Sequence, residues 1–139
     1  MSWISLQSSF ISKEYAQLIK LIEEGISPNS IDEEGNSLLH HACGNCDLPA
    51  IYILLSLGAN VNAVNKSNET VLGFLCSYND DDESLRIIAA RKILNSGHSL
   101  TVNKTYEEGY YVLAAFNNMN KLALILQRAE AGLDNEGGN

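Results

Sequence analysis

The stretch that decides the fold is GNSLLHHACGNCDLPAIYILLSLGANVNAVN, which occupies residues 35–65. It opens with a turn-forming Gly-Asn pair, followed by a short apolar segment that contains two histidines. A longer apolar run of helical length then continues to Leu55, and Gly58 begins a polar segment rich in asparagine. This order predicts a helix over the apolar run that ends at Leu55, followed by a turn at Gly58.

The flanking sequence repeats this stretch with a period of about 33 residues. Gly25 and Gly58 are one such period apart, and each glycine follows a similar apolar segment. Further pairs keep the same spacing: Asn29 with Asn62, Asp32 with Asn65, and Ser37-Leu38-Leu39 with Thr70-Val71-Leu72. A third copy ends at Gly97, which is about six residues later than one more period would place it and so indicates an insertion. Several residue types that agree at one period indicate stacked units, which bury one another's apolar faces.

The best-matched copy resembles the ankyrin repeat. Residues 35–42 resemble the family signature T-P-L-H-x-A, with Ser37 in place of Thr and Leu38 in place of Pro. The pair Leu54-Leu55 lies where the family's outer helix carries two leucines, and residues 58–63 resemble the closing turn. The resemblance implies an all-α solenoid of helix-turn-helix units joined by hairpin-like turns.

We expect one domain over residues 1–134, with units at about 2–32, 32–64, 65–102 and 103–134 and a disordered tail at 135–139. Gly25, Gly58 and Gly97 are expected to end outer helices with positive φ. Ser12 is the expected N-cap of the first outer helix, in a unit that serves as an N-terminal cap. The third unit should have helices at about 69–78 and 84–95, and Tyr111 should occupy the signature position of the fourth. The recurrent apolar positions predict a shared core of Leu39, Ala42, Ile51, Leu54, Leu55, Leu72, Leu75, Ile93 and Leu94.

The charge, the apolar runs and the cysteines of the chain limit the kinds of partner and cellular location that we expect. The 139 residues carry a net charge of −8, which favours a basic protein partner and disfavours nucleic acid and anionic lipid. We find no apolar run long enough to cross a membrane, and we expect no signal peptide. Three cysteines at unremarkable spacing favour a reducing, cytoplasmic location. We expect a monomer when the protein is free.

Two clusters could hold a metal ion. The string His41-x-Cys43-x-x-Cys46 has short Cys/His spacing of the kind that binds zinc, and a metal-dependent enzyme built on it is one hypothesis. The resemblance instead makes His40 a tie between neighbouring turns, and it makes Cys43 and Cys76, which are one period apart, small buried residues. The acidic stretch 79–83 lacks the glycine of a calcium loop and is expected to lead into an outer helix. We therefore expect no catalytic residue, no metal ion and no cofactor.

The resemblance implies a non-catalytic protein-interaction module that binds through its concave face, made by hairpin tips and inner helices. More specific alternatives are a small immunity or inhibitor protein that neutralises a toxin or enzyme, and an effector that binds a host protein. On this sequence the expected hairpin-tip residues are Glu33, Glu34, Asn36, Lys66, Ser67, Glu69, Glu107, Glu108 and Tyr110. The expected exposed ends of inner helices are Gly44, Asn45, Ser77 and Tyr78.

Overall fold

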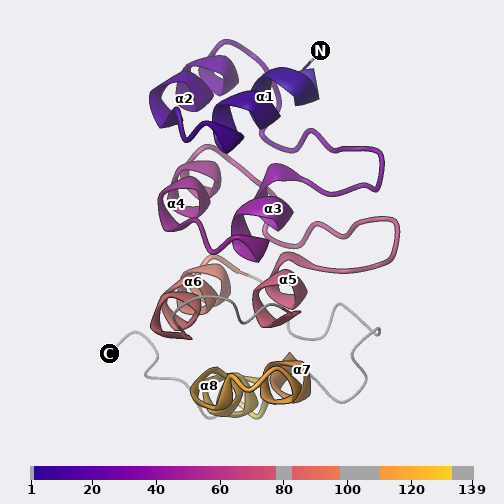
Figure 1. The fold of residues 1–139 in the computed structure, drawn as a ribbon, viewed down its shortest axis with the longest axis vertical. Helices are drawn as coiled ribbons and strands as arrows, with labels where there is room; N and C mark the ends of the chain where they lie inside the picture. The colour runs from indigo at the N-terminus through magenta and orange to yellow at the C-terminus, as the bar shows by residue number, and fades with distance from the viewer. Residues whose placement is uncertain (1, 78–82, 98–109, 133–139) are drawn as a thin grey trace.

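The computed structural model describes residues 2–77, 83–97 and 110–132. These residues form helices that pair one after another along the chain and stack into an elongated solenoid (Figure 1). The helices are α1 (Ser2–Ile11), α2 (Tyr15–Glu23), α3 (Leu38–Gly44), α4 (Leu48–Ser56), α5 (Val71–Ser77), α6 (Glu83–Asn95), α7 (Tyr110–Phe116) and α8 (Asn120–Glu130). The prediction of an all-α solenoid is confirmed for this part of the chain.

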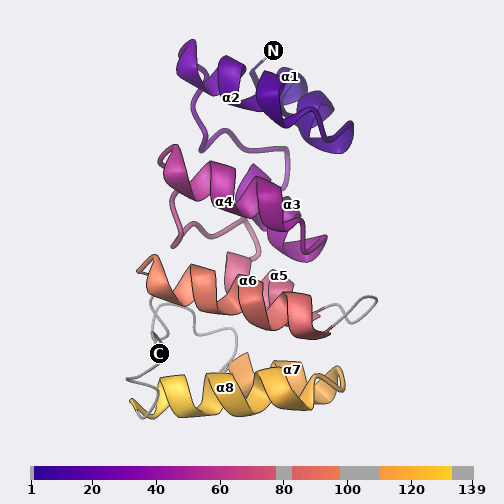
Figure 2. The same ribbon diagram turned by 90° about the vertical axis from the view of Figure 1, so that its left-hand side faces the viewer.

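The helices form two layers. The shorter inner helices α3, α5 and α7 stack with α1, and the outer helices α2, α4, α6 and α8 stack beside them (Figure 2). The hairpin turns that follow α2 and α4 project on the side of the inner helices, away from the outer ones (Figure 1). One edge of the molecule is therefore made of turns, and the opposite face is made of outer helices.

In three of the helix pairs the structure describes the turn between the two helices, and this turn fixes the register of the repeats. Lys13, Cys46 and Asn118 have left-handed φ values of 58°, 53° and 66°. The N–H of the residue that follows each of them donates to the carbonyl of Ser9, Ala42 or Ala114, at 2.9, 2.8 and 2.9 Å respectively. Lys13, Cys46 and Asn118 are therefore structurally equivalent, although they are different residue types.

This register corrects the prediction for Ser12. It is not an N-cap, because its N–H still donates to the carbonyl of Ser8 at the C-terminal end of α1. Glu14 is the residue that precedes α2, and its side chain makes no capping hydrogen bond.

The register also corrects the fourth unit. Asn118 corresponds to Cys46, and Tyr110 is the first residue of α7 as Leu38 is the first residue of α3. Tyr111 therefore corresponds to Leu39, and its predicted placement at the Ser37 position is wrong by two positions.

The outer helices end as predicted. Gly25, Gly58 and Gly97 have φ values of 120°, 99° and 101°, which only glycine adopts at little cost. Gly132 ends α8 in the same way, with a φ of 76°. After α2 and α4 the chain then turns back, because the N–H of the residue after the glycine donates to a carbonyl in the last turn of the helix.

The predicted core is mostly confirmed. Seven of its nine residues are fully buried, and they belong to the second and third units. Leu55 and Leu94 are only half-buried, which corrects their placement at the centre of the core. Each follows a fully buried residue, Leu54 or Ile93, and one residue turns a helix by about 100°, so both side chains lie at the edge of the interface.

Candidate functional site

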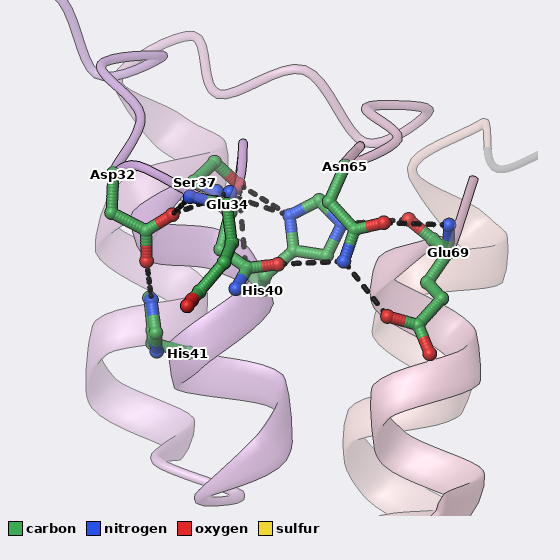
Figure 3. Close-up of polar contacts among 8 residues, drawn as sticks. Asp32, Glu34, Ser37, His40, His41, Asn65 and Glu69 are labelled. Carbon is green, nitrogen blue, oxygen red and sulfur yellow. Dashed lines mark hydrogen bonds and ion pairs between the residues drawn. The ribbon is translucent and has the colours of Figure 1, made fainter. Parts of the chain in front are cut away.

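Each of the two described hairpin turns is held by one side chain. The Oδ1 atom of Asp32 accepts hydrogen bonds from the N–H groups of Glu34 and Asn36, both at 2.9 Å (Figure 3). One repeat later, the Oδ1 atom of Asn65 accepts from the N–H groups of Ser67 and Glu69, also at 2.9 Å. The one-period spacing of Asp32 and Asn65 therefore reflects a shared role, because both fold the backbone around a side-chain oxygen.

The two turns also bind each other. The N–H of Lys66 donates to the carbonyl of Glu34 at 3.0 Å, and the Nδ2 atom of Asn65 donates to Oδ1 of Asn36 at 2.8 Å. Gly35 permits this approach, since a Cβ atom there would lie 2.9 Å from the nitrogen of Lys66. We call residues 31–37 and 64–70 the hairpin edge, and these contacts make it a continuous, ordered surface.

His40 ties the second unit to the third. The N–H of Ser37 donates to Nδ1 of His40 at 3.2 Å, and the N–H of His40 donates to Oγ of Ser37 at 3.3 Å, which forms a capping box at the start of α3. Because Nδ1 is the acceptor, Nε2 carries the proton and donates to the carbonyl of Glu69 at 2.9 Å. The predicted structural role of His40 is confirmed.

Stability should fall as the pH falls below the ordinary pKa of histidine. Burial lowers the pKa of His40, so the folded state binds fewer protons at this residue than the unfolded state does. Stability from neutral His40 is therefore complete above about pH 6.5 and is lost below it, by at most about 1.4 kcal/mol per pH unit. Urea unfolding between about pH 7.5 and 5.5 measures this slope. His40→Gln should flatten it, and parallel slopes in the two proteins would contradict the role assigned to His40.

A second histidine lies beside the hairpin edge on the inner-helix side. The Nε2 atom of His41 lies 2.9 Å from Oδ2 of Asp32, and its ring centroid lies 5.7 Å from that of Trp3. Partial burial opposes ionisation of Asp32, but hydrogen bonds from His41 and from the Asn36 and Glu34 N–H groups outweigh it and lower the pKa of Asp32. Asp32 therefore carries its charge while it holds the turn.

The predicted binding residues fall into several groups. The exposed ones are Glu33, Glu34, Asn45, Lys66 and Ser67, and the half-buried ones are Gly44, Glu69 and Ser77. Glu69 and Ser77 have local roles, since Oε1 of Glu69 accepts from Nδ2 of Asn65 and Oγ of Ser77 donates to the carbonyl of Gly73. Tyr78, Glu107 and Glu108 lie outside the described residues, as do positions 79–82 of the acidic stretch and the tail at 135–139.

Two predicted binding residues are buried, which corrects their assignment to an exposed tip. Asn36 is only 8% exposed, because its side chain accepts the hydrogen bond from Asn65 between the two turns. Tyr110 is only 1% exposed, and its hydroxyl lies 2.9 Å from Oγ1 of Thr70. Its N–H donates to Oε2 of Glu130 at 2.9 Å. Both residues join neighbouring parts of the solenoid.

No disulfide joins the three cysteines. Cys43 and Cys76 are fully buried, as predicted, and burial raises the pKa of both thiols. Cys46 is buried as well. Among the described residues, no group of three or more His, Cys, Asp or Glu side chains is arranged to hold a metal ion.

Arg86 is a structural residue that the sequence analysis missed. Its side chain is fully buried, and it donates to the carbonyls of Leu75 at 3.1 Å and Gly44 at 3.0 Å. These carbonyls belong to the last described turns of α5 and α3, and carbonyls at the C-terminal end of a helix generally need partners from outside the helix. One signal could have located it, because Arg86 stands as far before Gly97 in the sequence as the buried N-cap Asp47 stands before Gly58.

Comparison with known proteins agrees with this geometry. Residues 9–104 match a family model described as ankyrin repeats, in three copies, and the match covers well over half of the chain. No curated protein matches the chain significantly. In the part of the chain that the structure describes, no helix has the length and apolar character needed to cross a membrane. Ankyrin repeats are generally protein-interaction modules, typically without catalytic activity. The repeat period, the paired helices and the matched family together show that this chain belongs to the ankyrin-repeat family.

Proposed function

We propose that this protein is a non-catalytic module that binds a partner protein with a basic patch through the hairpin edge and the adjoining inner helices. The observation that carries the proposal is the pair Glu33 and Glu34, which are exposed at the tip of an ordered turn. Asp32 fixes the backbone that presents them, so little conformational entropy is lost when a partner binds.

The charge of the hairpin edge supports a basic partner. Glu33 and Glu34 are exposed beside Lys66, which is the one cation of these two described segments, and the chain as a whole carries a charge of −8. Rim charges of one sign speed association with a partner of the opposite sign and suppress the wrong partners. A form of this proposal is an inhibitor that covers the basic surface of a toxin or enzyme.

Aromatic rings lie on the inner helices that adjoin the hairpin edge, where the His41 ring contacts Asp32 and the Phe74 ring packs against that of His40. Trp3, His41 and Phe74 are half-buried on the inner helices, and His41 and Phe74 occupy equivalent positions one period apart. Aromatic side chains are enriched at binding hot spots, where a polar rim surrounds them. These residues supply the aromatic part of the proposed interface, and the glutamates supply its rim.

Cys43, Cys46 and Cys76 are buried and form no disulfide, which supports a reducing compartment such as the cytoplasm as the place of action. We further propose that the protein is a monomer when it has no partner.

Reversing the charge of the hairpin edge should slow association with the partner. A partner is first identified by affinity purification and mass spectrometry, and its association with purified wild type and Glu33→Lys/Glu34→Lys is then measured at several salt concentrations. We expect association to slow by about tenfold and to lose most of its salt dependence. Stability should change by less than about 0.5 kcal/mol, because both side chains are exposed.

The matched control is Glu23→Lys/Glu24→Lys, which makes the same change in charge at exposed residues at the end of α2. It should bind like the wild type. Normal binding by Glu33→Lys/Glu34→Lys, together with loss of binding by this control, would contradict the proposal.

A further inference from the structure

The outer helices carry a second surface whose chemistry differs from that of the hairpin edge. Leu54, Ile93 and Leu126 are fully buried residues of α4, α6 and α8. Residues two positions earlier are turned by about 200° and point outward. The outward positions in this row are Tyr52, Arg91 and Leu124.

This surface is unusually apolar for an exposed helix face. Tyr52 is 45% exposed, Ile88 is 44% exposed and Leu124 is 59% exposed, and Leu85 is also exposed. A soluble helix normally places charged or polar residues at such positions. Several large apolar side chains on neighbouring helices therefore indicate an interaction surface.

The charge of the surface is the opposite of that of the chain. Lys121 and Arg128 are exposed, and Arg91 and Lys92 are half-exposed. The two acidic residues of these helices form hydrogen bonds within the protein. Glu83 accepts from the N–H of Leu122, and Glu130 accepts from the N–H groups of Tyr110 and Tyr111. Among the described residues of α4, α6 and α8, the exposed charges are thus all positive.

A basic group and an apolar ring of this surface are in contact between α4 and α6. The Nζ atom of Lys92 on α6 lies 5.1 Å from the centroid of the Tyr52 ring on α4, so the surface is continuous between these two helices. The outer helices α4, α6 and α8 stack side by side on one face of the molecule, opposite the projecting turns (Figures 1 and 2). We call the outward residues of these helices the outer-helix face, and they are Tyr52, Leu85, Ile88, Arg91, Lys92, Lys121, Leu124 and Arg128.

We propose that the outer-helix face is a second docking surface, for an acidic amphipathic helix of a partner protein. An amphipathic helix matches both features, because its apolar stripe covers Tyr52, Ile88 and Leu124 while its flanking carboxylates meet the lysines and arginines. Nucleic acid would meet the cations but leave the apolar side chains without partners. An anionic membrane is a wide plane that also meets the negative remainder of the chain, whereas a helix meets this face alone.

The test uses a synthetic amphipathic peptide of about five helical turns, with leucines on one face and glutamates beside them. Its binding to the whole protein is measured by fluorescence anisotropy. We expect binding that weakens by about tenfold in Lys92→Glu/Lys121→Glu, and also in Leu124→Ser, which changes the apolar part. A peptide with lysine in place of each glutamate should bind at least about tenfold more weakly.

The Glu33→Lys/Glu34→Lys protein is the control, and it should bind the peptide like the wild type, so this proposal and the hairpin-edge proposal fail separately. Circular dichroism on each variant checks that the helices are retained. Equal binding by wild type and both outer-helix variants, or no binding by the wild type, would overturn the proposal. So would preferential binding of the wild type to phosphatidylserine vesicles or to single-stranded RNA.

Discussion

Replacing Arg86 with alanine should lower the free energy of unfolding by about 2–5 kcal/mol, because buried carbonyls lose their donor. The guanidinium group donates to Leu75 in its own unit and to Gly44 in the preceding unit. Each orphaned acceptor costs about 1–3 kcal/mol, and the side chain also leaves a cavity. Urea unfolding followed by circular dichroism measures the loss.

Two variants separate this role from general effects of charge and length. Arg86→Lys keeps the charge but has a single ammonium group in place of the planar fork, and it should recover only part of the stability. Arg91→Ala removes a cation from the same helix at a half-exposed position, and it should change stability by less than about 1 kcal/mol. Equal losses in Arg86→Ala and Arg91→Ala would show that Arg86 does not join the two units.

The repeat period made most of the fold predictable. A shared spacing links positions that must do the same physical task, such as the left-handed φ of Gly25 and Gly58 or the turn formed by Asp32 and Asn65. A positive φ or a turn held by a side-chain oxygen depends on local geometry, and the residue type indicates that geometry directly. For Arg86 the spacing marks the position but not the role, because its residue type differs from that of Asp47 and an arginine on an outer helix is usually solvated. The carbonyls that it binds lie in other helices.

The predictions for Ser12 and for the fourth unit were wrong for local structural reasons. Ser12 has the chemistry of an N-cap but lies at the C-terminal end of α1, where Lys13 adopts the left-handed φ that ends the helix. The fourth unit was misplaced because its register is set by Asn118, and its equivalents Lys13 and Cys46 are different residue types. Conformation is repeated at this position without a repeated residue type.

The candidate site was predictable only where exposure follows from position. Glu33 and Glu34 lie at the tip of a turn, and both are exposed. Asn36 lies in the same turn but is buried, because its oxygen accepts from Asn65 in the next unit. Contacts between units decide which polar residues of a turn remain available, and a single unit's sequence does not contain that information.

Replacing Leu54 with alanine should lower the free energy of unfolding by about 2–5 kcal/mol, the usual range for a fully buried leucine. Leu54 lies on α4, which packs against both α2 and α6, so the cavity would weaken two interfaces of the stack. Leu55→Ala is the matched comparison, since it removes the same atoms from a half-buried site and should cost distinctly less. Leu124→Ala, at an exposed site, should change stability by less than about 0.5 kcal/mol. Urea unfolding of the three variants gives the order directly, and a Leu55 variant less stable than the Leu54 variant would reverse the assignment of which leucine faces the core.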